Sequence, residues 1–257
     1  MGKTVKVLCV NTGKYDLFPM GTNITEVYHK MCEDVLPEAI AARVNNRTVS
    51  MNYEIYNPRQ VEFISFHDSS GMRAYVRTLT FILSSAIDEL FPNSHFRLEH
   101  PVSKGYYCEL NIDRPITADD LDAIKQRMKE LVAADNPIEY IEEESDQVIE
   151  MFRQRGRMDI VDLLETKGSL YSGYYKMGWH VDYYYGALAV STGMIKLFDL
   201  KPYFDGFLLQ IPDRNNPYKL EDIVPQKKML GVFNEYLKWN KIMNLSNVGD
   251  LNQAIIK

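Results

Sequence analysis

The sequence lacks a long apolar run, an excess of positive charge and closely spaced cysteines, and each lack excludes a class of protein. No stretch among its 257 residues approaches the roughly 18 continuous apolar residues of a membrane-spanning helix. The net charge is −6 and the pI is about 5.5, which disfavours a strong, nonspecific binder of polyanions but leaves a local basic groove open. The three cysteines are odd in number and far apart, which predicts reduced, structural thiols.

The N-terminus also lacks targeting signals. It has no apolar run of the kind found in a signal peptide, and Lys6 occupies the position where a myristoylation motif needs serine or threonine. We therefore expect a cytoplasmic protein with no membrane partner.

Two kinds of cofactor chemistry are missing as well. Gly13-Lys14 lacks the first glycine of a phosphate-binding loop, because position 8 is leucine, and Gly2-Lys3-Thr4 has no loop before it. The five histidines show no close ligand spacing, so no metal site is predicted. The sequence predicts no cofactor in this chain.

What remains is a chain long enough for two domains, with 46% hydrophobic residues to supply their cores. We predict an α+β protein with domains at residues 1–66 and 70–245, followed by a linker at residues 246–257. The boundary falls between His67 and Gly71.

A long helix and a hairpin organise the middle of the chain. Apolar residues at three- and four-residue spacing predict a helix that ends at Phe91-Pro92. Residues 96–100 and 106–112, on either side of Ser103-Lys104-Gly105, predict two strands joined by a tight turn.

The first 66 residues predict strands at 4–11, 15–18, 39–44, 48–51 and 61–66, and a helix capped by Asn23. This order is that of a small ubiquitin-like β-grasp. Beyond the hairpin, Thr117 opens a helix, and residues 146–155 and 158–165 predict two more. Further strands are expected at 137–141, 195–200 and 207–211, with Val181 to Tyr185 central to a sheet. A last helix, residues 226–243, is expected to turn Leu230, Phe233, Leu237 and Ile242 inward.

Several of these segments resemble known families. The β-grasp resembles the TGS module at the front of threonyl-tRNA synthetases, which docks or senses and carries no catalytic residue. The central helix with its Leu-Phe-Pro stop, the Gly-Tyr-Tyr exit of the turn and Arg114-Pro-Ile-Thr117 resemble the second, editing-type (SAD) domain of threonyl- and alanyl-tRNA synthetases. That resemblance implies a site that hydrolyses mischarged tRNA.

The groups that carry the editing reaction in that family are replaced in this sequence. Counting back from Pro92, the two helix histidines of the family correspond to Arg77 and Phe81. The later cysteine and histidine positions correspond to Tyr184 and Leu188. Asp182 matches an aspartate that the family keeps beside the cysteine position. The resemblance thus implies that the frame is kept while its four reactive groups are lost, so no catalytic residue is assigned.

Seven residues are candidates for ligand binding in what would be the inherited pocket: Arg77, His100, Lys104, Tyr107, His180, Asp182 and Tyr184. Tyrosine rings could stack a base, or could be packed in a sheet with their hydroxyls bonded at its rim. His180 and Asp182 lie two apart on a predicted strand and face the same side, so they could act as acid and base or form a structural hydrogen bond. Arg77 and Lys104 could contact phosphate or bridge surface carboxylates.

A second resemblance covers the whole chain. His100 to Tyr106, Gly168 to Tyr171, Ser191 to Gly193 and Val248 to Asn252 are similar to the N-terminal half of bacterial uridine kinase homologues. It implies a non-catalytic regulatory region that binds a nucleotide, a nucleoside or a tRNA acceptor end, with ATP and Mg²⁺ needed only by a kinase domain outside this sequence. Two alternatives remain: a free-standing hydrolase of aminoacyl-tRNA that uses His180, Asp182 and a water, and a structural module that forms a homo-oligomer.

Overall fold

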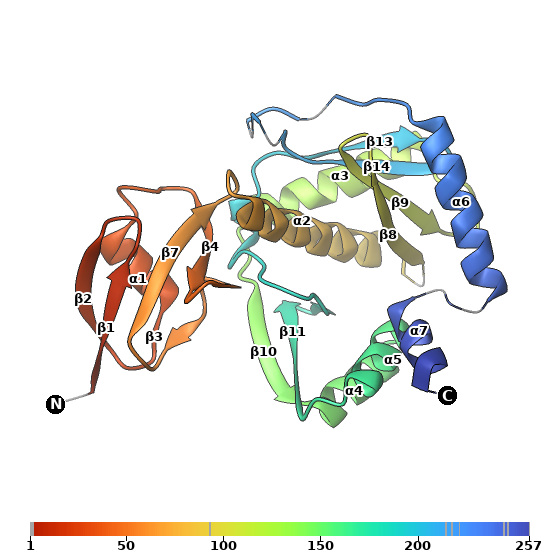
Figure 1. The fold of residues 1–257 in the computed structure, drawn as a ribbon. Helices are drawn as coiled ribbons and strands as arrows, with labels where there is room; N and C mark the ends of the chain where they lie inside the picture. Colours follow the sequence, from red (N-terminus) through yellow and green to blue (C-terminus); the bar gives the residue numbers. More distant parts are fainter. Residues whose placement is uncertain are drawn as a thin grey trace. The chain divides into compact units, whose positions relative to one another are not determined.

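A computed structural model describes residues 3–92, 94–213, 215–216, 218–220, 222–243, 245 and 247–256, with the side chains of Lys241 and Ile256 left out. It has the mixed helices and strands expected of an α+β protein (Figure 1). The chain forms two compact units. Unit 1 comprises Met1–Glu139, Met177–His180 and Tyr184–Ile223, and unit 2 comprises Tyr140–Lys176, Val181–Tyr183 and Val224–Lys257. The predicted boundary at residues 67–71 falls inside unit 1. The two domains expected at residues 1–66 and 70–245 therefore remain a prediction.

The first part of unit 1 is a five-stranded sheet in the order β2-β1-β7-β4-β5. Its strands are β1 (Thr4–Cys9), β2 (Lys14–Pro19), β4 (Ala39–Val44), β5 (Arg47–Val49) and β7 (Arg59–Ser65), and two short strands, β3 (Thr22–Asn23) and β6 (Glu54–Ile55), pair separately. Val5, Val7 and Cys9 alternate into the core, while Lys6 points outward and is exposed. The predicted order of strands and helix is confirmed, whereas β3 and β6 are too short for a period-two pattern to reveal.

Helix α1 (Ile24–Met31) begins where the sequence predicts. The side chain of Asn23 accepts a hydrogen bond from the backbone N–H of Glu26 at 2.9 Å, which satisfies one of the free donors of the first turn. Ile24 and Val27 then bury one face of the helix against the sheet.

Helix α2 (Ser69–Leu90) is the longest element of the fold. Asp68 caps its start by accepting from the N–H of Ser70 at 2.7 Å, and it ends at Phe91, as predicted from Pro92. From Leu79 to Ile87 every side chain is buried, so this part of α2 is enclosed on all sides.

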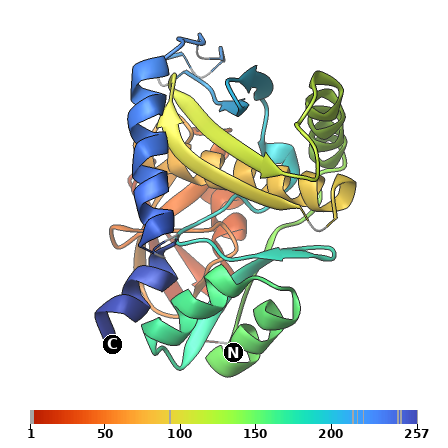
Figure 2. The same ribbon diagram turned by 90° about the vertical axis from the view of Figure 1, so that its right-hand side faces the viewer.

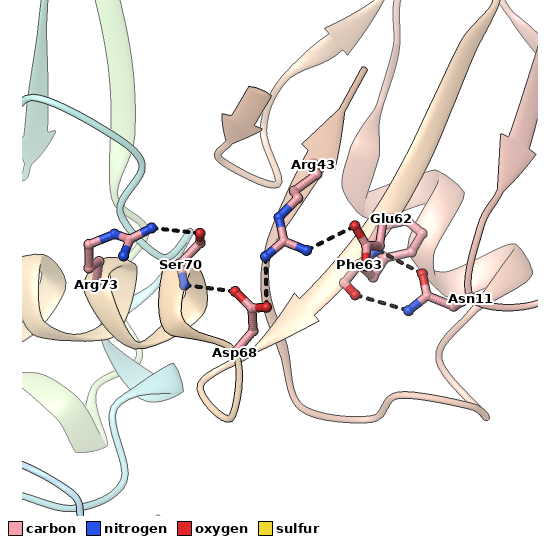
Figure 3. Close-up of polar contacts among 7 residues, drawn as sticks. All are labelled: Asn11, Arg43, Glu62, Phe63, Asp68, Ser70 and Arg73. Carbon is pink, nitrogen blue, oxygen red and sulfur yellow. Dashed lines mark hydrogen bonds and ion pairs between the residues drawn. The ribbon is translucent and has the colours of Figure 1, made fainter. Parts of the chain in front are cut away.

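An ion-pair bridge joins the start of α2 to the sheet (Figure 3). The guanidinium of Arg43, on β4, lies 2.9 Å from Glu62 of β7 and 2.7 Å from Asp68. The backbone approaches closely at the same place, since a Cβ on Gly71 would lie 1.9 Å from the carbonyl oxygen of Ser65. The ion pairs of Arg43 and the lack of a side chain at Gly71 thus fix the position of α2 against the sheet.

The rest of unit 1 is a four-stranded sheet, a helix and a loop. The sheet has the order β13-β14-β9-β8, from β8 (His95–Val102), β9 (Gly105–Asn111), β13 (Asp199–Tyr203) and β14 (Gly206–Gln210). Ser103 and Lys104, with φ of 51° and 57°, form the predicted tight turn between β8 and β9. That hairpin lies against α2 (Figure 2).

Helix α3 (Ala118–Ala133) packs on α2 and on the short 3₁₀ helix η1 (Thr192–Met194). The helix begins after Thr117, as predicted, and its N-terminus has more hydrogen bonds than a single capping side chain supplies. Thr117 and Asp120 exchange side chain to backbone hydrogen bonds in a capping box, and Arg114 binds the carboxylate of Asp120.

Unit 2 contains four helices and most of the sheet β10-β11-β12, of which Glu139, Met177 and His180 belong to unit 1. The strands are β10 (Glu139–Glu144), β11 (Tyr171–Met177) and β12 (His180–Asp182), and the helices are α4 (Ser145–Gln154), α5 (Met158–Lys167), α6 (Lys227–Ile242) and α7 (Val248–Ile256). Phe152, Leu164, Tyr174 and Val181 form part of its core.

Four predictions in this part of the chain are wrong. Val181 to Tyr185 is not central, because β12 is an edge strand that ends at Asp182. The strand expected at 195–200 begins only at Asp199. Ile242 is 72% exposed instead of buried. The segment expected to be a linker, residues 246–257, contains helix α7, which packs on α5; Ser246 and Lys257 lie outside the described residues.

Within the described part of the chain, no helix has the length and hydropathy needed to cross a membrane.

Candidate functional site

The loop of residues 184–190 contacts α2, which carries Arg77 and Phe81. Thr78 holds it there: its hydroxyl accepts from the N–H of Ala189 at 2.8 Å and donates to the carbonyl of Ala74 on its own helix. Gly186 has φ of +123°, and a Cβ there would lie 2.8 Å from the Cζ atom of Arg77. The glycine thus leaves room for the guanidinium of Arg77, which approaches the carbonyl of Ala187 to 3.5 Å.

Phe81 fills the place where the resemblance predicts a second histidine. Its side chain is fully buried, with ring centroids 4.8 Å from His180 and 6.0 Å from Tyr184. Leu188, at the other lost histidine position, is also fully buried. Two of the four family positions therefore hold apolar side chains that pack the site closed.

His180 forms a dyad with Asp88. The Nδ1 atom of His180 lies 3.2 Å from the Oδ2 atom of Asp88, and the imidazole side chain is 2% exposed against 45% for the carboxylate. Asp88 lies seven residues after Phe81, on the same face of α2. A carboxylate at Nδ1 assigns the proton to that nitrogen, so Nε2 carries a lone pair in the neutral ring.

The Nε2 atom of His180 is buried without a hydrogen-bond partner among the described residues. Such an atom usually marks a bound water or a functional role, because leaving a buried polar atom unpaired costs about 1–3 kcal/mol. The ring of Trp179, whose centroid lies 5.6 Å from that of His180, is 52% exposed.

The predicted pairing of His180 with Asp182 is wrong. Asp182 is an ion-pair partner of Arg157 instead, with 3.0 Å between the Nη1 and Oδ1 atoms, and it also accepts from the N–H of Tyr183. In the structure each residue has a different partner: Asp88 for His180 and Arg157 for Asp182.

The three candidates on the β8–β9 hairpin lie in different surroundings, and their part in ligand binding stays a prediction. Tyr107 is a core residue, 2% exposed and packed on Tyr203, and burial raises its pKa to about 12. Lys104 is exposed at the turn. Burial lowers the pKa of His100 against the opposing effect of Glu109.

Of the seven predicted residues, Arg77 lies on α2 and the rings of His180 and Tyr184 lie against Phe81 of the same helix. His100, Lys104 and Tyr107 lie on the β8–β9 hairpin, and Asp182 belongs to unit 2. The structure adds Asp88, which the sequence interpretation missed. A signal for Asp88 exists: it continues the spacing of Phe81 and Ser85 along one face of a helix that is otherwise apolar there. What the arrangement offers chemically is one oriented imidazole, His180, and one cation, Arg77, that lies against the loop of residues 184–190.

No family model matches the sequence. Among curated proteins, the chain is 26% identical over 204 residues to a threonine–tRNA ligase of Caldanaerobacter subterraneus subsp. tengcongensis, covering 78% of this chain and 32% of the relative. It is 32% identical over 170 residues to the threonine–tRNA ligase of Wolbachia pipientis subsp. Culex pipiens, covering 65% and 26%. A third relative, from Natranaerobius thermophilus, is 31% identical over 136 residues, 53% of this chain and 21% of the relative.

The chain therefore spans about a third or less of the length of these curated relatives. They also overturn the interpretation of the chain as the N-terminal region of a uridine kinase homologue, because the similarity is to threonine–tRNA ligases. Over most of its length, this chain is similar to a part of a threonyl-tRNA synthetase.

Proposed function

We propose that the chain is an editing-like module that acts on the aminoacyl end of a tRNA, with His180 as the general base of ester hydrolysis and Asp88 as the residue that positions it. The single observation that carries this proposal is the dyad inside the retained frame, with Nδ1 held by a carboxylate and Nε2 unpartnered. The similarity to threonine–tRNA ligases supports the substrate class. In this proposal residues 1–66 are a TGS-like module and the domain around α2 is the editing-type domain.

In the reaction that follows from this geometry, a water attacks the carbonyl carbon of the aminoacyl ester while Nε2 takes its proton. The tetrahedral intermediate then expels the ribose oxygen, which receives the proton back from Nε2, and the products are a free amino acid and an uncharged tRNA. Asp88 stabilises the imidazolium that forms between the two steps. Arg77 supplies positive charge beside the site for a tRNA phosphate. Because the His180 side chain is 2% exposed, neighbouring side chains have to move for substrate to reach Nε2.

A second candidate function is binding of the aminoacyl end without hydrolysis. The observation that favours it is the packing of Phe81 and Leu188 at two of the four family positions, which leaves little room for a reacting ester. The experiment below separates the two.

The test is a deacylation assay on the whole chain with threonine-accepting tRNA that carries radiolabelled threonine or serine. Serine is included because one methyl group gives a binding site little means of discrimination. We expect wild-type protein to release amino acid faster than buffer. His180→Gln should lower the rate by about 100-fold or more and Asp88→Asn by less, since a general base contributes roughly 10²–10⁴.

The matched control is His95→Gln, which alters an exposed histidine on β8 and should leave the rate unchanged. Thermal unfolding of each variant shows that loss of rate is not loss of fold. Binding of aminoacyl-tRNA with no release above buffer would reject hydrolysis in favour of the second candidate. Failure to bind would reject both.

A further inference from the structure

A second, unrelated feature lies on the outer face of the five-stranded sheet of unit 1. There Lys6, Leu8, Tyr15, Asn46, Arg59 and Gln60 are among the residues that line a shallow hollow of about 460 Å³. The sheet register explains it: Leu8 faces Tyr15 on β2 and Gln60 on β7, and the turn after β4 folds over one end. That turn is fixed by Asn45, whose Oδ1 accepts from the N–H of Gln60 at 3.2 Å.

The hollow is positively charged although the chain is acidic. Among the described residues, Lys6 and Arg59 form no ion pair, and Arg47 just beyond the turn forms none either. The nearby carboxylates are already neutralised: Asp16 lies 2.6 Å from Lys30, and Glu62 lies 2.9 Å from Arg43. Two cations that form no ion pair among the described residues, Lys6 and Arg59, therefore line the hollow.

An exposed aromatic ring lies beside these cations. Tyr15 is 61% exposed, and the Nζ atom of Lys6 lies 4.3 Å from its ring centroid. Asn46 and Gln60 are exposed and add amide groups that can donate to or accept from a base or a ribose hydroxyl. Cations that follow a backbone, with an aromatic ring for a base, are the elements with which proteins bind single-stranded nucleic acid.

We infer that this groove binds single-stranded RNA, with phosphates at Lys6 and Arg59 and a base stacked on Tyr15. The choice of RNA over other anions follows from the combination of aromatic ring, amides and two cations, because a simple anion needs only the charge. It rests on the proposed function only in taking RNA as the natural polymer for this chain, and the site is separate from His180.

The test is fluorescence anisotropy with a labelled 12-nucleotide single-stranded RNA of mixed sequence and the whole chain. Lys6→Glu with Arg59→Glu should weaken binding at least tenfold. Lys6→Ala alone should reduce the slope of log K against log salt by about 0.7, the value for one phosphate contact on a single strand. Tyr15→Ala should weaken binding by about tenfold, from the loss of one stacked base.

The control is Lys129→Glu, half the charge change of the double variant, at an exposed lysine of α3 that has no ion pair among the described residues, and it should bind within twofold of wild type. Equal binding by the Lys6/Arg59 variant and this control would overturn the inference, as would no RNA binding by wild type. Equal affinity for a poly-glutamate peptide that is indifferent to Tyr15→Ala would overturn it too. These variants leave His180 intact, so the two proposals can fail separately. If the Lys6/Arg59 variant binds RNA with unchanged affinity and still deacylates aminoacyl-tRNA, the groove is rejected and the proposed function stands.

Discussion

Two regions of unit 1 bear on function in opposite ways. Around α2, Phe81, Leu188 and His180 are buried, and among the described residues there Nε2 of His180 and Oγ of Ser85 are buried polar atoms without a hydrogen-bond partner. On the outer face of the five-stranded sheet, Lys6, Tyr15 and Gln60 are exposed. A buried site fixes few groups firmly, so its chemistry depends on one dyad. The side chains of an exposed groove are held by few contacts. Specific binding there therefore depends on how many charged groups and aromatic rings act together.

The largest effect on stability should come from opening a cavity in the buried region around α2. Phe81→Ala removes a fully buried ring and leaves a cavity, which typically costs about 3–5 kcal/mol of unfolding free energy. Urea denaturation measures it. A loss below about 1 kcal/mol would mean that the region is not packed as described.

A second variant tests the junction between the two regions. Gly71→Ala places a Cβ 1.9 Å from the carbonyl oxygen of Ser65, so the backbone has to shift, at a cost of about 1–3 kcal/mol or more. The control is Gly231→Ala on α6, where a Cβ meets nothing within 4 Å and helix propensity predicts a gain of up to about 1 kcal/mol. Equal stability of the two variants would contradict the close approach at Gly71.

The same junction should make stability depend on pH. Burial raises the pKa of Asp68, but the hydrogen bond from Arg43 and the N–H of Ser70 outweigh it, so the folded pKa is below its usual value. Between the folded pKa and the usual pKa of Asp68, the unfolded chain therefore binds more protons than the folded chain. The stabilisation is present above a pH of about 4 and is lost as the pH falls through the folded pKa.

Arg43→Met removes the cation of this bridge. We expect a loss of about 1 kcal/mol at pH 7, because both partners of Arg43 are partly exposed, and a flatter dependence of stability on pH below about 4. Thermal unfolding from pH 7 to pH 2.5 measures both. An unchanged acid limb would show that Asp68 is not held by Arg43.

The smallest effect should come from the exposed side. Tyr15→Ala should change the unfolding free energy by no more than about 0.5 kcal/mol, since the ring is mostly in solvent. Circular dichroism during denaturant titration measures it. A loss above about 1.5 kcal/mol would place Tyr15 in the packing instead of at a surface for ligand.

Periodicity and capping residues predicted α1, α2, α3 and the β8–β9 hairpin, because each depends on neighbours in sequence such as Asn23, Thr117 and Pro92. The edge position of β12 and the exposure of Ile242 depend on which distant element covers a segment, which local pattern does not encode. The functional assignments divide in the same way. His180 stood out as a titratable residue in the sequence, but its partner Asp88 lies 92 positions away on another element.

The parallel pairing of β1 with β7 also has a consequence for the order of folding. Val7 lies opposite Arg59, so the two central strands meet only after a loop of about fifty residues has closed, whereas the β1–β2 and β4–β5 hairpins close over a few residues. Lys6 and Leu8 come from one of these central strands, and Arg59 and Gln60 from the other. The groove is therefore assembled late, and its formation, followed in time through the exposed Tyr15, would report completion of the sheet and not of either hairpin.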